Sequence, residues 1–204
     1  MYIKELSKGI KIKGFKKNGL TWLCQCDPFV YMFRIDPGKY CDKNWQYYTL
    51  EIGIYSSDVF GLCWGKVPKG KSVKNTDCCL RGRISDFFQE NGNIEFYEGV
   101  EVKELQERIN FLIGKDIIPF FNKIKSFEKL YRIMLFYEEK AIQQELHQIY
   151  IACIEYVMNK KNDALIRLEK INNQYEYLQP IITQYFIDNK SEIWLLFLIA
   201  HSKR

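Results

Sequence analysis

The chain has 204 residues, of which 30 are basic and 25 are acidic, so its formal net charge is +5. Hydrophobic residues make up 47% and charged residues 27% of the chain. This balance is typical of folded globular proteins and excludes a wholly disordered chain, a collagen and a coiled-coil rod. The longest apolar run covers residues 193–200. A membrane-spanning helix needs about 20 apolar residues, so we expect no membrane segment.

Cysteine usage indicates the compartment. The chain contains seven cysteines, an odd number, and its first 17 residues carry six lysines in place of the apolar core of a secretory leader. These features predict reduced thiols and a cytoplasmic protein.

The first hundred residues predict a helix followed by a sheet. Residues 2–12 place their apolar side chains on one helical stripe. Four later runs have the alternation of a β-strand, namely 20–26, 29–35, 47–55 and 78–84. Short connections between the early runs favour antiparallel pairing. Residues 56–77 are interpreted as a long loop with a brief strand at 59–64.

The pattern becomes helical after residue 99. Apolar residues recur at helical spacing in 100–114, Pro119 is expected to kink or restart the helix, and Ser126 is a suitable N-cap. Further helices are predicted over 138–159, 162–175, 178–188 and 190–202, the first two as an antiparallel hairpin.

These elements together predict an α+β fold. An antiparallel sheet of four or five strands is packed by helices and followed by a C-terminal helical unit. We assign residues 1–135 to the α+β domain and residues 136–204 to a helical extension packed on it.

Several short motifs carry a resemblance to a known family. They are the opening Gly14-Phe15-Lys16-Lys17 with Leu20-Thr21-Trp22, the strand 50–54, the strand with Cys78, Arg81 and Arg83, and the later Asp116-Ile117-Ile118-Pro119-Phe120. In this order they resemble the bacterial domain-of-unknown-function family numbered 4304, over roughly residues 1–135. The resemblance implies an α+β fold and a bacterial cytosolic setting. It implies no catalytic residue, because the family has no established activity.

Residues 65–72 fit the P-loop pattern G-x-x-x-x-G-K-[ST], with Gly65, Gly70, Lys71 and Ser72 at the defined positions. In a P-loop the backbone N–H groups bind phosphates, the lysine reaches the β- and γ-phosphates, and the Ser binds Mg²⁺. Such a loop needs a strand before it and a helix after it in a parallel α/β fold. The neighbouring residues favour an antiparallel sheet, and the nearest Walker-B-like segment, 185–188, lies in helical sequence.

Metal and nucleophile patterns are weak. Cys24-x-Cys26 and Cys78-Cys79 lack the turn-based spacing of zinc knuckles, so we expect buried thiols, with Cys41 and Cys63 near turns and more exposed. The two histidines, His147 and His201, are interpreted as surface helix residues. We therefore predict no catalytic residue, no metal and no cofactor.

One acidic residue lies inside a predicted strand. Glu51 is expected to form an ion pair with Arg81 or Arg83, in a structural role more than a catalytic one.

Aromatic and basic residues could form a stacking face for single-stranded nucleic acid, but core filling is the favoured interpretation. These residues are Tyr31, Phe33, Arg34, Trp45, Tyr47 and Tyr48. Two lysine clusters are expected to be solvated: one lies within residues 4–17, and the other comprises Lys66, Lys69, Lys71 and Lys74.

Three functions follow, in order of preference. The first is a non-enzymatic protein-binding module of an accessory or immunity type, with a protein partner. The second is an anion or nucleic-acid binder that uses the N-terminal lysines and the loop 65–74. The third is a nucleotide-binding enzyme that uses residues 65–72. No oligomeric state is predicted.

Overall fold

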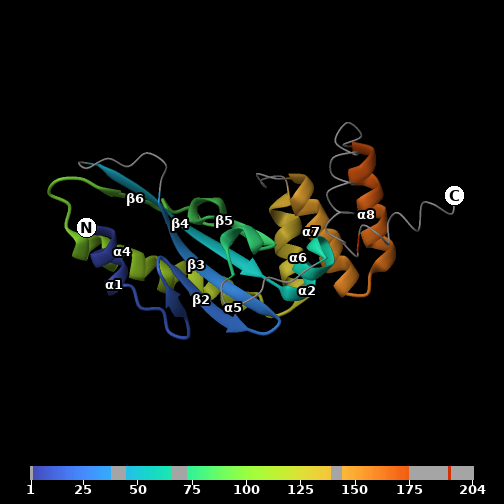
Figure 1. Ribbon diagram of the computed structural model, residues 1–204, viewed down its shortest axis with the longest axis horizontal. Coiled ribbons are helices and arrows are strands. Elements are labelled where there is room, and N and C mark those ends of the chain that lie inside the picture. Colours follow the sequence, from blue (N-terminus) through green and yellow to red (C-terminus); the bar gives the residue numbers. More distant parts are fainter. Residues whose placement is uncertain (1, 38–44, 66–72, 139–143, 175–192, 194–204) are drawn as a thin grey trace. The chain divides into compact units, whose positions relative to one another are not determined.

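The computed structural model describes residues 2–37, 45–65, 73–138, 144–174 and 193 (Figure 1). The chain forms two compact units, the first from residues 1–54 and 81–123, the second from residues 55–80 and 124–204. The predicted helices 178–188 and 190–202 lie outside the described residues, apart from Ile193. The assignment of domains to 1–135 and 136–204 stays a prediction.

The α+β prediction is confirmed, with an antiparallel sheet at the centre of the first unit. The strands are β1 (Lys16–Asn18), β2 (Thr21–Cys26), β3 (Phe29–Pro37), β4 (Gln46–Tyr55), β5 (Leu80–Arg83) and β6 (Asn93–Phe96). Their order is β1-β2-β3-β4-β5, and β6 pairs with β4. The described sheet has six strands because the short β1 and β6 join the four strands predicted from alternation.

Side-chain alternation explains the core of this unit. Trp22 of β2 pairs with Phe33 of β3, and their rings lie 5.3 Å apart. Both are buried, as are Phe29, Tyr31 and Ile35 on alternate positions of β3. Residues two apart on a strand share one face, so these side chains form a continuous apolar layer.

Three helices accompany the sheet in this unit: α1 (Tyr2–Gly9), α4 (Val102–Leu112) and α5 (Ile118–Lys123). A fourth, α3 (Ile84–Phe87), follows β5. A π-helical turn over Ile113–Ile117 joins α4 to α5, which then begins one residue before Pro119. The backbone is right-handed helical at both ends of this turn, at Ile113 and at Ile118, so the chain continues as a helix through Pro119 and the predicted restart does not occur.

The end of α1 is fixed by side chains from α4. The amide of Gln106 donates hydrogen bonds to the carbonyls of Glu5 and Leu6, at 3.0 and 3.3 Å, and the amide of Asn110 donates to the carbonyl of Gly9, at 3.2 Å. The last carbonyls of a helix lack partners within it, so these bonds satisfy acceptors that would otherwise need water.

The second unit is helical: α2 (Ser57–Trp64), α6 (Phe127–Phe136), α7 (Gln144–Val157) and α8 (Lys161–Gln174), with a 3₁₀ turn at Asn75–Asp77. The expected strand at 59–64 was wrong, because these residues form α2. Val59, Phe60 and Cys63 are its buried residues. Their spacing of one and four suits one face of a helix, whereas alternation would have suited a strand.

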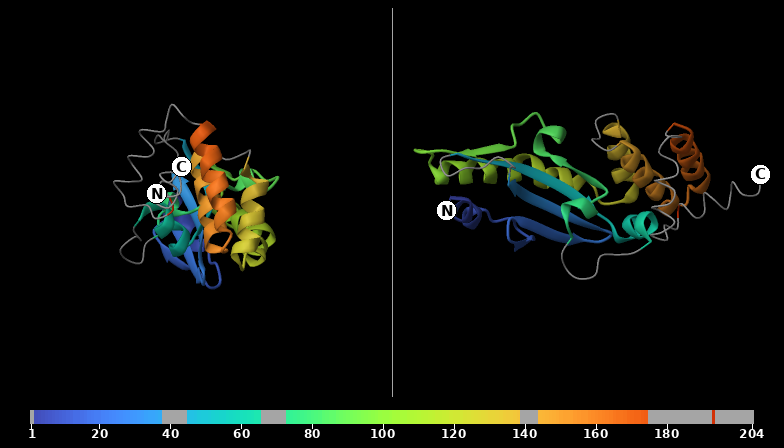
Figure 2. Two further views of the ribbon diagram at one scale, coloured as in Figure 1. Left: turned by 90° about the vertical axis from the view of Figure 1, so that its right-hand side faces the viewer. Right: turned by 45° about the horizontal axis from the view of Figure 1, so that its top comes forward.

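The predicted pairing of two long helices is confirmed within this unit. Ala152 of α7 and Ala164 and Leu168 of α8 are buried, and α7 and α8 lie side by side (Figure 2). Ser126 caps α6 as predicted, since its Oγ accepts a hydrogen bond from the backbone N–H of Lys129.

Candidate functional site

The surroundings of the P-loop-like segment differ from those of a phosphate loop. Gly65 has a left-handed backbone, with φ of 65°, and its N–H donates to the carbonyl of Gly61, so it ends helix α2. Among the described residues, a helix precedes the segment, and the 3₁₀ turn and β5 follow it. The other predicted positions, Gly70, Lys71 and Ser72, lie outside the described residues. Gly65 therefore acts as a helix cap, which excludes the strand-loop order that a P-loop needs.

The cysteines divide between the two units. Cys63, Cys79 and Cys153 are fully or almost fully buried in the second unit, so the expectation that Cys63 is exposed was wrong. Burial raises the pKa of Cys79 to about 12 and raises the pKa of Cys63, which also hydrogen-bonds Cys153. The thiols of Cys63 and Cys79 are therefore protonated at neutral pH, and all three side chains fill the core like small apolar groups. Cys41 lies outside the described residues.

No group of three or more His, Cys, Asp or Glu side chains in the described ranges could hold a metal ion. In the first unit, Cys24 and Cys26 are half-buried on β2, where they pair with Tyr31 and Phe29.

Glu51 lies beside Arg34, and the two predicted arginines, Arg81 and Arg83, also act on its charge. Its carboxylate is 4.0 Å from the guanidinium of Arg34, which also pairs with Asp36. Burial and the neighbouring Asp36 raise the pKa of Glu51, while Arg34, Arg83 and Arg81 act in the opposite direction. This partial burial of a paired carboxylate fits the structural role that the sequence predicted.

Core filling is confirmed for three of the five aromatic residues in the predicted set. Tyr31, Phe33 and Tyr48 are buried, whereas Trp45 is 39% exposed. Arg34 and Tyr47 are half-buried. The favoured core-filling interpretation therefore holds for these three rings, and Trp45 is the part of the set that is exposed.

That exposed part continues on a neighbouring strand. Tyr47 pairs with Glu95 of β6. The register, extended by one residue beyond the last pair Gln46–Phe96, sets Trp45 opposite Tyr97, just outside the two strands. Trp45 and Tyr47 stack with ring centroids 5.8 Å apart, and Tyr97 is 54% exposed. We call Trp45, Tyr47, Glu95 and Tyr97 the open β4–β6 face. The alternate residues of this pair, Tyr48, Ile94 and Phe96, are buried.

The backbone of β6 also presents polar groups to the surface. Leu50 donates to the carbonyl of Gly92, which fixes the register so that residues 92, 94 and 96 bond to β4. The C=O of Asn93, the N–H and C=O of Glu95 and the N–H of Tyr97 then point away from β4. The only partner strand of β6 in the described sheet is β4, so these groups form an open edge (Figure 1).

The segment around this edge is acidic. Residues 93–104 contain four exposed glutamates and one lysine, which gives a formal charge of −3 in a chain of net charge +5. The glutamates are Glu95, Glu98, Glu101 and Glu104. Aromatic rings, outward backbone groups and negative charge therefore coincide at one edge of the sheet.

The N-terminal lysines lie elsewhere in the first unit and are exposed, as predicted. Lys17 donates to the carbonyl of Ser7 and lies 5.1 Å above the ring of Trp22. Of the second cluster, Lys66, Lys69 and Lys71 lie outside the described residues.

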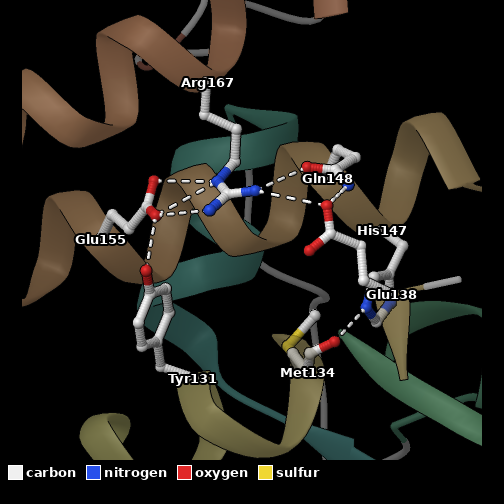
Figure 3. A network of polar contacts seen from close by, with 7 residues as sticks. All are labelled: Tyr131, Met134, Glu138, His147, Gln148, Glu155 and Arg167. Carbon is white, nitrogen blue, oxygen red and sulfur yellow. Dashed lines mark hydrogen bonds and ion pairs between the residues drawn. The ribbon is translucent and has the colours of Figure 1, made fainter. Parts of the chain in front are cut away.

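A buried ionic network joins three helices of the second unit (Figure 3). Arg167 of α8 donates to both carboxylate oxygens of Glu155 of α7, at 2.8 to 3.1 Å, and to Gln148 at 2.7 Å. Tyr131 of α6 donates to Glu155 at 3.0 Å. The Glu155 side chain is 2% exposed and that of Arg167 is 18% exposed. Burial opposes the charge on Arg167, but its bonds to Glu155 more than offset this and raise its pKa.

His147 lies next to this network and corrects a prediction. It is 7% exposed, not on the surface, and its Nε2–H donates to the carbonyl of Met134 at 2.9 Å (Figure 3). Burial lowers the pKa of His147, although this bond and Glu138 act in the opposite direction. His201 lies outside the described residues.

We expect the lowered pKa of His147 to make stability depend on pH. Below the ordinary His pKa of 6.5 the unfolded chain binds a proton that folded His147 does not accept until a lower pH. The contribution of His147 is thus complete above pH 6.5 and is lost as the pH falls towards its folded pKa. Urea unfolding between pH 7.5 and pH 5 should show a smaller loss of free energy in His147→Gln than in the unchanged chain.

His201→Gln is the control, because it removes the other histidine and should leave the pH dependence unchanged. Equal pH dependence in His147→Gln and the unchanged chain would contradict the assignment to His147.

Sequence reasoning missed Glu155, Arg167 and Tyr97. Glu155 could have been noticed as the one charged residue in the run 149–157, which is otherwise apolar or aromatic. Its partner could not, because hydrogen bonding between α7 and α8 depends on their rotation about their axes. Tyr97 becomes significant only through the register that sets it beside Trp45.

The fold and this edge define an α+β protein built on an antiparallel sheet with an exposed aromatic and acidic end. The family model described as "Domain of unknown function (DUF4304)" matches residues 6–123, more than half of the chain, and the chain belongs to this family. The match confirms the resemblance found in the sequence. It includes the open β4–β6 face and ends before α6, so the Glu155–Arg167 network lies outside it.

Comparisons with curated proteins and with solved structures gave no match. Within the described ranges, no helix has the length and apolar character needed to cross a membrane.

Proposed function

We propose that this chain is a non-enzymatic protein-binding module that takes up a partner polypeptide at the open β4–β6 face. The observation that supports it is the exposure of Trp45 and Tyr97, which directly flank a strand pair whose alternate side chains are buried. Tyr and Trp are the residues most enriched among those that dominate the energy of protein interfaces. An accessory or immunity-type role in the bacterial cytoplasm is the biological setting that we propose for such a module.

A physical argument favours this function over the two alternatives. Exposed aromatic rings lose little conformational entropy when a partner covers them, because they have only two rotatable side-chain bonds. Four exposed glutamates beside the rings would repel phosphate groups, which disfavours a nucleic acid at this face. Gly65 ends α2, which disfavours the nucleotide-binding enzyme.

The test is selection of random peptides displayed on phage against the immobilised full chain, followed by affinity measurement with fluorescent peptides. We expect selected peptides whose affinity falls about tenfold or more in Trp45→Ser and in Tyr97→Ser. Phe136→Ser is the matched control, since Phe136 is 72% exposed but belongs to the second unit. Selected peptides that bind all three variants equally, or no selected peptide at all, would refute the proposal.

A further inference from the structure

The open edge of β6 limits how a partner can bind. The C=O of Asn93, the N–H and C=O of Glu95 and the N–H of Tyr97 are directed outward, as the register requires. Two neighbouring groups are already used: the N–H of Asn93 bonds to the side chain of Asn91, and the carbonyl of Tyr97 accepts from Val100. The remaining groups, which are the donors of Glu95 and Tyr97 and the carbonyls of Asn93 and Glu95, match the hydrogen-bonding pattern of an added strand.

The side chains on the two faces of the sheet at this edge indicate which side chains an added strand would need. Glu95 is exposed at the centre of β6, so a residue opposite it on an added strand would favour a positive charge. Tyr97 beside Trp45 offers aromatic faces that attract Lys and Arg. On the opposite face of the sheet, the buried side chains of Ile94 and Phe96 would favour apolar side chains on the added strand.

Together these observations define one partner chemistry. We propose that β6 binds an extended basic segment of a partner protein as an additional strand, with Lys or Arg over the open β4–β6 face and apolar residues alternating on the other side. The proposal rests on the proposed function and adds the backbone mode and the charge of the partner. The acidic segment 93–104 also attracts such a segment from a distance, more strongly at low salt.

The experiment uses the full chain and short blocked peptides as probes. The first peptide alternates lysine and valine. The second alternates glutamate and valine, and the third alternates lysine and glycine, which keeps the charge but removes the strand propensity. A fourth repeats the first with N-methyl groups on one backbone edge. We expect the first peptide to bind about tenfold or more tightly than each of the others. A single-stranded oligonucleotide is included as a further probe and should not bind.

Two readouts report on the backbone. Hydrogen exchange should slow at the amides of Glu95 and Tyr97 when the first peptide binds, with little change at Ile94, whose amide already faces β4. Glu95→Pro removes one outward donor at an edge position that tolerates proline, whereas Glu95→Gln removes only the charge. We expect Glu95→Pro to abolish binding and Glu95→Gln to weaken it severalfold.

The outcomes separate this inference from the proposed function. Equal binding of the lysine-glycine peptide, unchanged exchange at Glu95, or preference for the glutamate peptide or the oligonucleotide would overturn the inference. If the inference is overturned but the affinity of phage-selected peptides still falls in Trp45→Ser and Tyr97→Ser, the proposed function stands without the added-strand mode. Loss of that dependence refutes both.

Discussion

Arg167→Ala should destabilise the protein by about 3–5 kcal/mol, the cost of breaking a buried ion pair by removing one partner. The substitution leaves the Glu155 carboxylate, 2% exposed, with Tyr131 as its remaining hydrogen-bond donor in the network. It also removes the bond from Arg167 to Gln148. A buried Glu155 carboxylate without a cation lowers the stability of the fold, because the surrounding helices exclude the water that would solvate its charge.

The measurement is the free energy of unfolding in urea for the full chain at pH 7. Arg132→Ala is the matched control, because Arg132 is exposed on α6 and should change stability by less than about 0.5 kcal/mol. The double variant Glu155→Leu with Arg167→Met removes both charges. It should recover much of the loss, since apolar replacement of a buried pair is often neutral. A loss below about 1 kcal/mol in Arg167→Ala would contradict the burial of the network.

Strand prediction succeeded where alternation and turns agreed. In β2 and β3 every second residue is apolar, and Asp27-Pro28 marks the turn between them, so both strands were predicted to within two residues. The segment 57–64 failed because its residues are mostly apolar or aromatic. Such a run fits a strand or a buried helix equally well in sequence, and only the burial of Val59, Phe60 and Cys63 separates them.

The site was less predictable than the fold, for a physical reason. Gly65 fits a phosphate-loop pattern and also fits a helix C-terminus, because both need a glycine that adopts positive φ. His147 was interpreted as a surface residue because a histidine alone is weak evidence for a site. Its burial depends on α6, whose Met134 carbonyl accepts its hydrogen bond. The residue pattern of a helix or strand predicts which of its faces is apolar. The burial of a site residue also depends on the other elements that pack against it.

Phe121→Ala is expected to have the second large effect, a loss of about 3–5 kcal/mol in the free energy of unfolding. Phe121 lies on α5, is 2% exposed, and stacks on Tyr31 of β3 with ring centroids 4.8 Å apart. Phe15 and Phe120 lie within 6.1 Å of the same ring, so its removal leaves a cavity lined by aromatic groups. Partial collapse of such a site recovers little of the lost contact energy.

Phe111→Ala is the control, because it removes the same type of side chain from an exposed position and so shows how much of the loss at Phe121 is due to burial. Phe111 lies on α4, is 63% exposed and contacts Lys115 through its ring face, so we expect its loss to cost about 1 kcal/mol or less. Phe121→Leu, which keeps most of the volume, should cost less than about 1.5 kcal/mol. Urea unfolding of the three variants tests the order, and equal losses at Phe111 and Phe121 would contradict it. Tyr31 of β3 and Phe121 of α5 both lie within the residues that match the family. We expect their stacked rings to be the contact that fixes α5 against the sheet.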